Sequence, residues 1–250
     1  MELTILGSSG TWPGPGRATC GYLLSHEGAH LWVDAGSGTF ARLQQWIRVD
    51  QMTGIVISHG HPDHFSDMLM CFYARRYGGL GDPGLPVFSP PDFTDKAALL
   101  VAEEGMKVLL EDFAFTAMHD GDEITIGPFA VTAFEMVHVG VEALGYRIQA
   151  GGLTLAYSGD AGPSDNLVEL ARDADLFLCE ATYQESSTTY PFHMSARQAG
   201  EHATKAGAKR LMLTHIVPTL DAAVSVAEAL EVFEGPVSAA DEGSVVEITA

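Results

Sequence analysis

The segment His59-Gly60-His61-Pro62-Asp63-His64 carries three imidazoles and one carboxylate within six residues. Alternate residues of an extended segment point to the same side, so His59 and His61 can face one ion together. The proline after His61 disfavours helical geometry there and keeps that pairing available. The last two residues of the segment lead into an expected helix, Phe65 to Tyr77, and can face a second ion. Imidazoles and carboxylates ligate zinc, so the spacing predicts a metal site rather than an ordinary polar loop.

Further ligand candidates lie where apolar runs end and the chain breaks into a loop, which is where site residues of α/β sheets usually stand. These candidates are His138 after residues 134–137, Asp160 after residues 155–159 and His215 after residues 211–214. His193 lies in a loop directly before a predicted helix. The other histidines lack this setting and are interpreted as surface or structural residues, namely His26, His30, His119 and His202.

Composition limits the function classes. The chain has 250 residues, 46% of them hydrophobic, and carries 33 acidic against 13 basic side chains for a net charge of −20. Such a balance disfavours a broad nucleic-acid surface, which usually shows a basic patch. The cysteines Cys20, Cys71 and Cys179 are widely separated and are expected to be small buried apolar residues. There is neither a signal-peptide pattern nor a membrane-length apolar run, so we expect a cytoplasmic protein without a membrane partner.

The elements that must position these residues follow from hydrophobic periodicity and turn signals. Strands are predicted over residues 2–6, 20–25, 31–34, 54–58, 85–88, 113–116, 123–126, 130–137, 143–149, 153–158, 176–179, 210–213 and 245–248. Helices are predicted over residues 39–49, 65–77, 92 to about 104, 166–172, 195–206 and 221–233. Each half runs through strands first and then alternates strands with helices. This order predicts an α/β fold of two stacked sheets with helices outside, and no linker divides residues 1–250 into domains.

The glycine-rich stretch from Gly7 to Gly16 lacks the Gly-Lys-Ser/Thr ending of a phosphate loop, and no helix directly follows it. We therefore expect a turn-rich loop at the rim of a site.

The pattern His59-x-His61-x-Asp63-His64, followed by His138, Asp160 and His215, resembles the metallo-β-lactamase superfamily over essentially the whole chain. Four further stretches resemble its ribonuclease Z branch, namely Tyr157–Asp160, Cys179–Thr182, His193–Ser195 and Leu213–His215. The overall layout is also similar to a small actinobacterial group linked to cyclic-nucleotide phosphodiesterase activity. The resemblance implies the four-layer αββα sandwich of the metallo-β-lactamase type, as one domain over residues 1–250.

The resemblance also implies a ligand set for two zinc ions, with manganese or iron as alternatives. In that set His59, His61 and His138 hold one ion, Asp63, His64 and His215 hold the other, and Asp160 bridges them. Asp34, which follows its own strand, is predicted either to orient a ligand imidazole or simply to cap a turn.

The mechanism implied by the resemblance is attack on phosphorus by a hydroxide held between the two ions. Asp63 would also take the proton from the water. His193 would hydrogen-bond a phosphoryl oxygen or protonate the leaving oxygen. Glu180 would orient His193, although a structural glutamate is an equal alternative at that position.

The sequence constrains the identity of the substrate less than it constrains the metal ligands. Ribonuclease Z often inserts a long arm between its later ligands, whereas only 21 residues separate His138 from Asp160 here. Together with the acidic charge, this favours a small phosphodiester such as a cyclic nucleotide over transfer RNA. The alternatives are a transfer-RNA-processing ribonuclease Z, an ester, thioester or lactone hydrolase on the same metals, and a non-catalytic metal-binding or partner-binding module. By analogy with the ribonuclease Z branch, we also expect the chain to form a homodimer.

Overall fold

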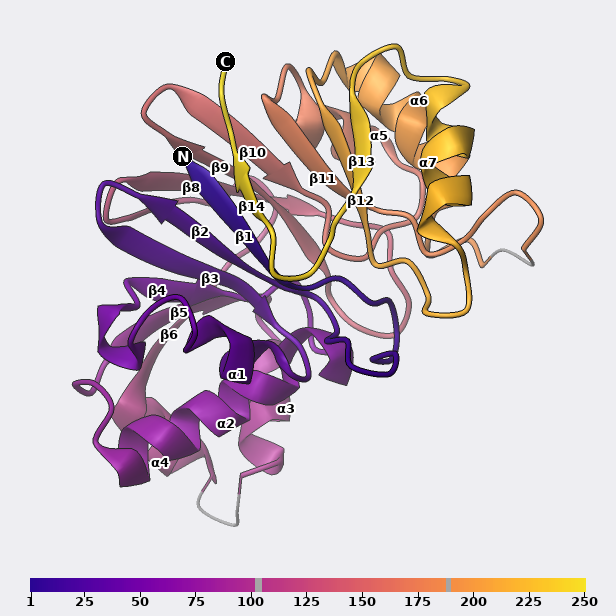
Figure 1. Cartoon of the computed structure of the whole chain (residues 1–250). Coiled ribbons are helices and arrows are strands. Elements are labelled where there is room, and N and C mark those ends of the chain that lie inside the picture. Colours follow the sequence, from indigo (N-terminus) through magenta and orange to yellow (C-terminus); the bar gives the residue numbers. More distant parts are fainter. Residues whose placement is uncertain (102–104, 188–189) are drawn as a thin grey trace.

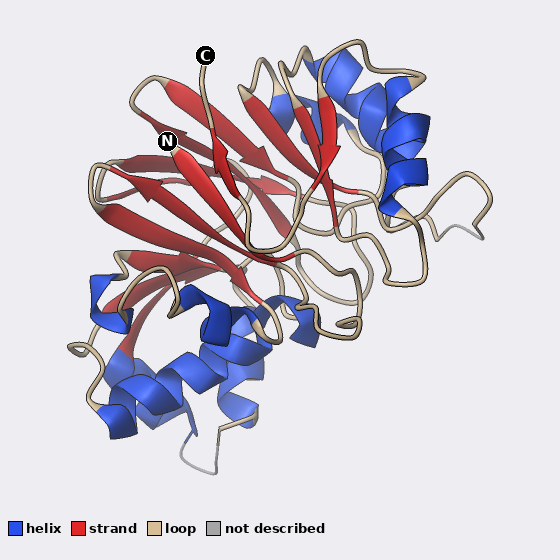
Figure 2. Ribbon diagram, in the orientation of Figure 1, coloured by secondary structure: helices blue, strands red, loops and turns tan. Residues whose placement is uncertain are grey.

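Two seven-stranded sheets lie face to face in the computed structural model, which describes residues 1–101, 105–187 and 190–250. Figure 1 and Figure 2 show one group of helices outside the first sheet and another outside the second. The molecule thus has four layers, in the order helix, sheet, sheet, helix. The four-layer αββα arrangement expected from the sequence is confirmed.

The first sheet is built from the N-terminal half of the chain together with the last strand. Its strands in spatial order are β14 (Val245–Glu247), β1 (Glu2–Gly7), β2 (Gly21–His26), β3 (Ala29–Ala35), β4 (Gly54–Val56), β5 (Leu85–Ser89) and β6 (Phe113–Ala117). β3 to β6 run parallel, so their carboxyl ends open at one edge. The helices on this sheet are α1 (Thr39–Leu43), α2 (Pro62–Gly78), α3 (Phe93–Leu99) and α4 (Gly105–Asp112).

The second sheet repeats the plan with the other half of the chain. Its strands in spatial order are β13 (Val237–Ala239), β12 (Leu211–Thr214), β11 (Leu176–Glu180), β10 (Leu153–Tyr157), β9 (Leu144–Ala150), β8 (Phe129–Glu135) and β7 (Glu123–Ile126). β10 to β13 run parallel. The helices on this sheet are α5 (Asp165–Ala171), α6 (Ala196–Ala206) and α7 (Ala222–Leu230).

The alternation of side chains along each strand explains the layers. In β2, Tyr22 and Leu24 face the core between the two sheets, whereas Leu23 faces the core under the helices. In β11, Leu178 faces the inter-sheet core and Phe177 packs under α5–α7. Because successive strand residues point to opposite faces, a continuous apolar run supplies two cores at once.

Three tyrosines join the two sheets near the edge where the site residues gather. The hydroxyl of Tyr22 lies 2.5 Å from Thr214 Oγ1, and Tyr146 donates to the carbonyl of Ile57 at 2.8 Å. Tyr157 donates to Asp34 at 2.5 Å. Burying these hydroxyls is tolerated because each has a partner on the opposite sheet, and the bonds fix how the two edges face each other.

Several predicted boundaries need correction. The helix predicted over residues 39–49 is wrong beyond Leu43, because the chain continues as turns and a short 3₁₀ segment at Val49–Gln51. The predicted apolar face consisted of Phe40, Leu43, Trp46 and Ile47. Three of these side chains are buried without one continuous helix, whereas Trp46 is 44% exposed. The helix predicted from residue 65 begins at Pro62, whose fixed φ suits the first position of a helix.

Two elements were not predicted, and one prediction cannot be followed to its end. α4 and the three-residue β13 were missed, because both are short. The helix predicted from residue 92 is present as α3 up to Leu99, and its predicted end at 104 lies outside the described residues. In the described parts of the chain, no helix is long and apolar enough to cross a membrane.

Gly36 shows how tightly the first sheet is fitted to the site. A Cβ built at Gly36 would lie 2.0 Å from the carbonyl oxygen of Asp63 and 2.3 Å from Thr19 Oγ1. We therefore predict that Gly36→Ala lowers the free energy of unfolding by about 2 kcal/mol or more, because backbone must move to admit the methyl group. Urea unfolding measures this change.

Gly78, at the far end of α2, is the matched control. A Cβ there would meet only Leu80, at 3.5 Å, so Gly78→Ala should be neutral or stabilise the helix by up to about 1 kcal/mol. Equal unfolding midpoints for the Gly36 and Gly78 variants would contradict the tight contact at Asp63.

Candidate metal centre

The seven predicted ligands come from four separate stretches of the chain and meet at one edge of the sandwich. His59 and His61 lie in the loop after β4, and Asp63 and His64 lie in the first turn of α2. The others follow strands, with His138 after β8, Asp160 after β10 and His215 after β12. The structure thus brings all seven together, as the sequence predicted, while their role as ligands stays a prediction.

The first cluster consists of three imidazoles. Nδ1 of His61 lies 3.0 Å from Nε2 of His59 and 3.1 Å from Nε2 of His138. The other ring nitrogen of His138 donates to the carbonyl oxygen of Phe192 at 3.1 Å. That bond places the hydrogen of this ring on Nδ1, so Nε2 offers its lone pair to the centre of the cluster.

The second cluster joins two imidazoles to two carboxylates. Nε2 of His215 lies 3.3 Å from Oδ2 of Asp63 and 3.3 Å from Oδ2 of Asp160. Nε2 of His64 lies 3.1 Å from the other oxygen of Asp160. This mixture of nitrogen and carboxylate oxygen suits zinc, manganese or iron.

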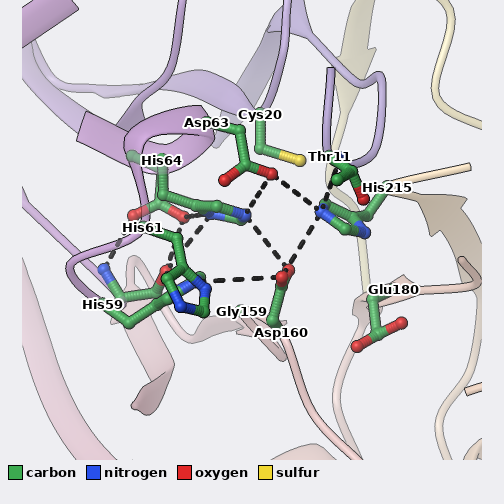
Figure 3. A network of polar contacts seen from close by, with 12 residues as sticks. Thr11, Cys20, His59, His61, Asp63, His64, Gly159, Asp160, Glu180 and His215 are labelled. Atoms are coloured by element: carbon green, nitrogen blue, oxygen red, sulfur yellow. Dashed lines mark hydrogen bonds and ion pairs between the residues drawn. The ribbon is translucent and has the colours of Figure 1, made fainter. Parts of the chain in front are cut away.

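Asp160 lies between the two clusters, and Figure 3 shows its carboxylate facing His59 and His61 on one side and His64 and His215 on the other. Its Oδ2 is 3.8 Å from Nε2 of His59 and 3.9 Å from Nε2 of His138. The side chain is 3% exposed, so water does not compete for these contacts. A carboxylate in this position can offer an oxygen to each of two ions.

The donor chemistry fits a cation. Nδ1 of His64 bonds Asp34 at 2.7 Å, which places its hydrogen there and turns the Nε2 lone pair toward Oδ1 of Asp160. Two buried acceptors thus face each other, and within the described residues neither has a hydrogen-bond partner. Such an arrangement is costly unless a proton or a metal ion lies between the two atoms.

The two clusters differ in the direction in which the pKa values of their histidines are shifted. Burial lowers the pKa values of His59, His61 and His138, so these rings are neutral and can ligate a metal. Burial also disfavours charge on His64, but Asp160, Asp63 and Asp34 outweigh it and raise the pKa of His64 well above its usual value. The acidic side chains therefore favour positive charge at the second cluster.

Asp34 holds the rings of two predicted ligands, His64 directly and His59 through Ser58, which agrees with one of the two roles predicted for it. It is fully buried, its Oδ2 accepts the Nδ1 hydrogen of His64, and Tyr157 and Ser58 donate to the same oxygen. The hydroxyl of Ser58 also contacts Nδ1 of His59 at 3.0 Å. Because that hydroxyl already donates to Asp34, it accepts from His59 and turns the Nε2 lone pair of that ring inward.

His193 and Glu180 form a pair beside the second cluster. Nδ1 of His193 lies 3.0 Å from Oε1 of Glu180 and 3.9 Å from Oδ2 of Asp160, and its ring stacks on that of His215. Burial lowers the pKa of His193, but the hydrogen bond to Glu180 and the charge of that carboxylate raise it to about 9. His193 therefore favours the protonated form, in which Nε2 can donate to a substrate oxygen.

Four residues around the centre had no role in the sequence interpretation: Ser58, Tyr157, Thr182 and Cys20. Ser58 and Tyr157 contact Asp34, and Thr182 contacts His215, so these contacts form only in the folded chain. The family-like stretches that include Tyr157 and Thr182 do not predict them. Cys20 is buried and free, as expected of an apolar cysteine, but its Sγ also lies within 4.8 Å of ligand nitrogens of His64 and His215. The remaining cysteines, Cys71 and Cys179, are buried and free as well.

Comparison with known proteins agrees with this geometry. A family model described as a β-lactamase superfamily domain matches residues 30–216. An uncharacterized protein of Mycobacterium leprae is 35% identical over 257 residues, covering 100% of this chain and 89% of that protein. The Bacillus subtilis protein named probable metallo-hydrolase YhfI is 30% identical over 250 residues, covering 98% of this chain and 99% of its own. A ribonuclease Z of Mycobacterium bovis is 26% identical, covering 88% of this chain and 87% of that enzyme.

Solved structures extend the similarity to three dimensions. The crystal structure of YhfI matches with a TM-score of 0.88 at 27% identity, covering 98% of this chain and 99% of that one. Human tRNase Z, short form, matches with a TM-score of 0.78 at 22% identity over 100% of both chains, which shows a shared fold. The chain therefore belongs to the β-lactamase superfamily, has the metallo-β-lactamase fold and is a metal-dependent hydrolase.

Proposed function

We propose that this hydrolase cleaves phosphodiester bonds in small substrates, such as cyclic nucleotides. We further propose that it uses two divalent metal ions and that both are zinc. One observation carries the proposal: two clusters of ligand atoms share Asp160, and His193, held by Glu180, reaches the same centre. A two-metal centre with an adjacent proton donor suits the displacement of an oxygen leaving group from phosphorus.

The roles of the chain's own groups follow from their positions. His59, His61 and His138 would hold one ion, Asp63, His64 and His215 the other, and Asp160 would contact both. The ions, when bound, would activate a water molecule and neutralise charge on the phosphoryl group. Asp63 belongs to the second cluster and would accept the proton of that water. His193 would donate a hydrogen bond or a proton to a substrate oxygen, with Glu180 holding its ring.

A cavity beside the centre supports a small substrate. It has a volume of about 680 Å³, is bordered by the metal-cluster residue His138, and is within the size range of small-molecule sites. Its described lining includes no lysine or arginine but four carboxylates, those of Asp92, Glu135, Glu142 and Asp165. Repulsion by these carboxylates grows with the charge of the substrate, so it disfavours a polyanion such as transfer RNA more than a phosphodiester that carries a single charge. The chain between His138 and Asp160 forms the hairpin of β9 and β10, and no arm extends from it.

The substrate class is tested with purified protein loaded with zinc or manganese. The panel is bis-p-nitrophenyl phosphate, cyclic AMP, a transfer RNA precursor and a lactone. We expect turnover of the first two and little of the others. Lactone hydrolysis without phosphodiester turnover would overturn the proposal in favour of the ester or lactone class. Efficient processing of the RNA precursor would instead support the ribonuclease Z alternative.

We predict that His193→Ala lowers kcat on the phosphodiester about 10²–10⁴-fold, because the substrate oxygen loses its donor. Metal content by mass spectrometry should stay at the wild-type level, since none of the seven predicted ligands is altered. His119→Ala is the control, because the ring of His119 is exposed, contacts Asp122 and belongs to none of the ligand clusters. A rate near that of the wild type with full metal content would refute the role of His193.

We predict that Asp160→Asn lowers the bound zinc from two ions per chain to one or none and abolishes turnover. An amide keeps the shape of the side chain but cannot offer an anionic oxygen to each ion. Asp175→Asn makes the same change at another buried carboxylate, which bonds Lys209 and the backbone of Thr154 instead. If the Asp160 variant retained two zinc ions, the bridging assignment would fail.

A further inference from the structure

Thr182 stands two residues beyond the end of β11 and touches three groups of the centre. Its Oγ1 lies 2.6 Å from Oε2 of Glu180, 2.8 Å from Nδ1 of His215 and 3.2 Å from Nδ1 of His193. We propose that Thr182 is a positioning residue whose hydroxyl fixes the ring of His215 as a metal ligand and ties that ring to Glu180. The metal part of this inference stands on its own, and the catalytic part rests on the proposed phosphodiesterase function.

The hydrogen-bonding capacity of a hydroxyl decides which atom donates in each contact. A threonine hydroxyl has one hydrogen and two acceptor lone pairs. Glu180 can only accept when ionised, so the hydrogen of Thr182 goes to that carboxylate, with which it makes the shortest contact. The hydroxyl therefore accepts from His215, which places the hydrogen of that ring on Nδ1 and leaves the Nε2 lone pair for a metal ion.

A second contact of His215 independently supports this tautomer. The backbone N–H of Thr11 lies 3.3 Å from Nε2 of His215 and can only donate to it, so a metal ion on Nε2 would replace this hydrogen bond. Nε2 is therefore the acceptor nitrogen and Nδ1 carries the hydrogen. The same Nε2 faces the carboxylates of Asp63 and Asp160.

Glu180 is a rigid anchor for this arrangement. It is fully buried and accepts from the backbone N–H of Ala161 at 2.7 Å and of Met194 at 3.1 Å. Ala161 directly follows Asp160, and Met194 directly follows His193. One carboxylate thus holds the chain beside the bridging ligand, the chain beside the proton donor and, through Thr182, the ring of His215.

Removal of the hydroxyl leaves a buried donor without a partner. Thr182 is 2% exposed and His215 is 1% exposed, so water cannot replace the lost acceptor. The ring of His215 would then rotate or change tautomer, and either change turns the Nε2 lone pair away from the second cluster. The methyl group of Thr182 plays no part in this account.

Two substitutions separate the hydroxyl from the methyl group. Thr182→Val keeps the shape and loses the hydroxyl, whereas Thr182→Ser keeps the hydroxyl and loses the methyl group. Zinc affinity is measured by competition with a chelating indicator, and kcat and KM are measured on bis-p-nitrophenyl phosphate at saturating zinc. We expect Thr182→Val to weaken the weaker-bound zinc about 10–100-fold and to lower kcat more than it changes KM, and Thr182→Ser to remain close to wild type.

Thr204→Val is the matched control, because it removes a hydroxyl that donates to the carbonyl of Val232 outside the centre. Wild-type zinc affinity in Thr182→Val, or an equal loss in Thr182→Ser, would overturn the proposal. The first outcome would make the hydroxyl dispensable, and the second would assign the effect to packing.

A measurement on the wild type keeps the inference testable even if the valine variant does not fold. Long-range ¹H–¹⁵N spectra of the zinc-loaded protein report which nitrogen of each histidine carries hydrogen. We expect His215 to carry it on Nδ1, and hydrogen on Nε2 would overturn the proposal. Because this spectrum and the zinc titration involve no turnover, they remain informative if the phosphodiester substrate is wrong.

Discussion

The structure depends on one buried contact between two acceptors. Nε2 of His64 and Oδ1 of Asp160 face each other at 3.1 Å, and neither has a hydrogen-bond partner among the described residues. A folded chain tolerates such a pair only where a positive charge occupies the space between the acceptors. The two sheets, joined at this edge by bonds from Tyr22, Tyr146 and Tyr157, hold that space in a fixed geometry.

The orientation of the predicted ligand rings depends on the residues that hydrogen-bond to their outward-facing nitrogens. Asp34 sets the rings of His64 and His59, the second of them through Ser58, and the carbonyl of Phe192 sets that of His138. Each outer contact is a bond from a ring N–H to oxygen, so in each ring the other nitrogen faces the centre. The chain thus prepares a set of inward lone pairs, which is the requirement for tight and ordered metal binding.

Much of this centre could be predicted from the sequence, because ligand type and strand-end position are local signals. His138 and His215 were found in this way, and the four-layer fold followed from the order of strands and helices. The contacts of Tyr157 and Thr182 were not predicted. Tyr157 meets Asp34 only after the two sheets stack, and Thr182 meets His215 only after β11 and β12 pair within the second sheet. The helix predicted over residues 39–49 ends at Leu43, because turns bury Ile47 and leave Trp46 exposed without a continuous helix.

The central claim is that this edge of the sandwich is a two-metal centre. The most direct test is a zinc titration of metal-stripped protein, followed by calorimetry and by mass spectrometry of the native protein. The account predicts two tightly bound ions per chain, and one or none once the carboxylate of Asp160 is removed. Saturation of the wild-type protein at one ion per chain, or two ions retained without that carboxylate, would contradict it.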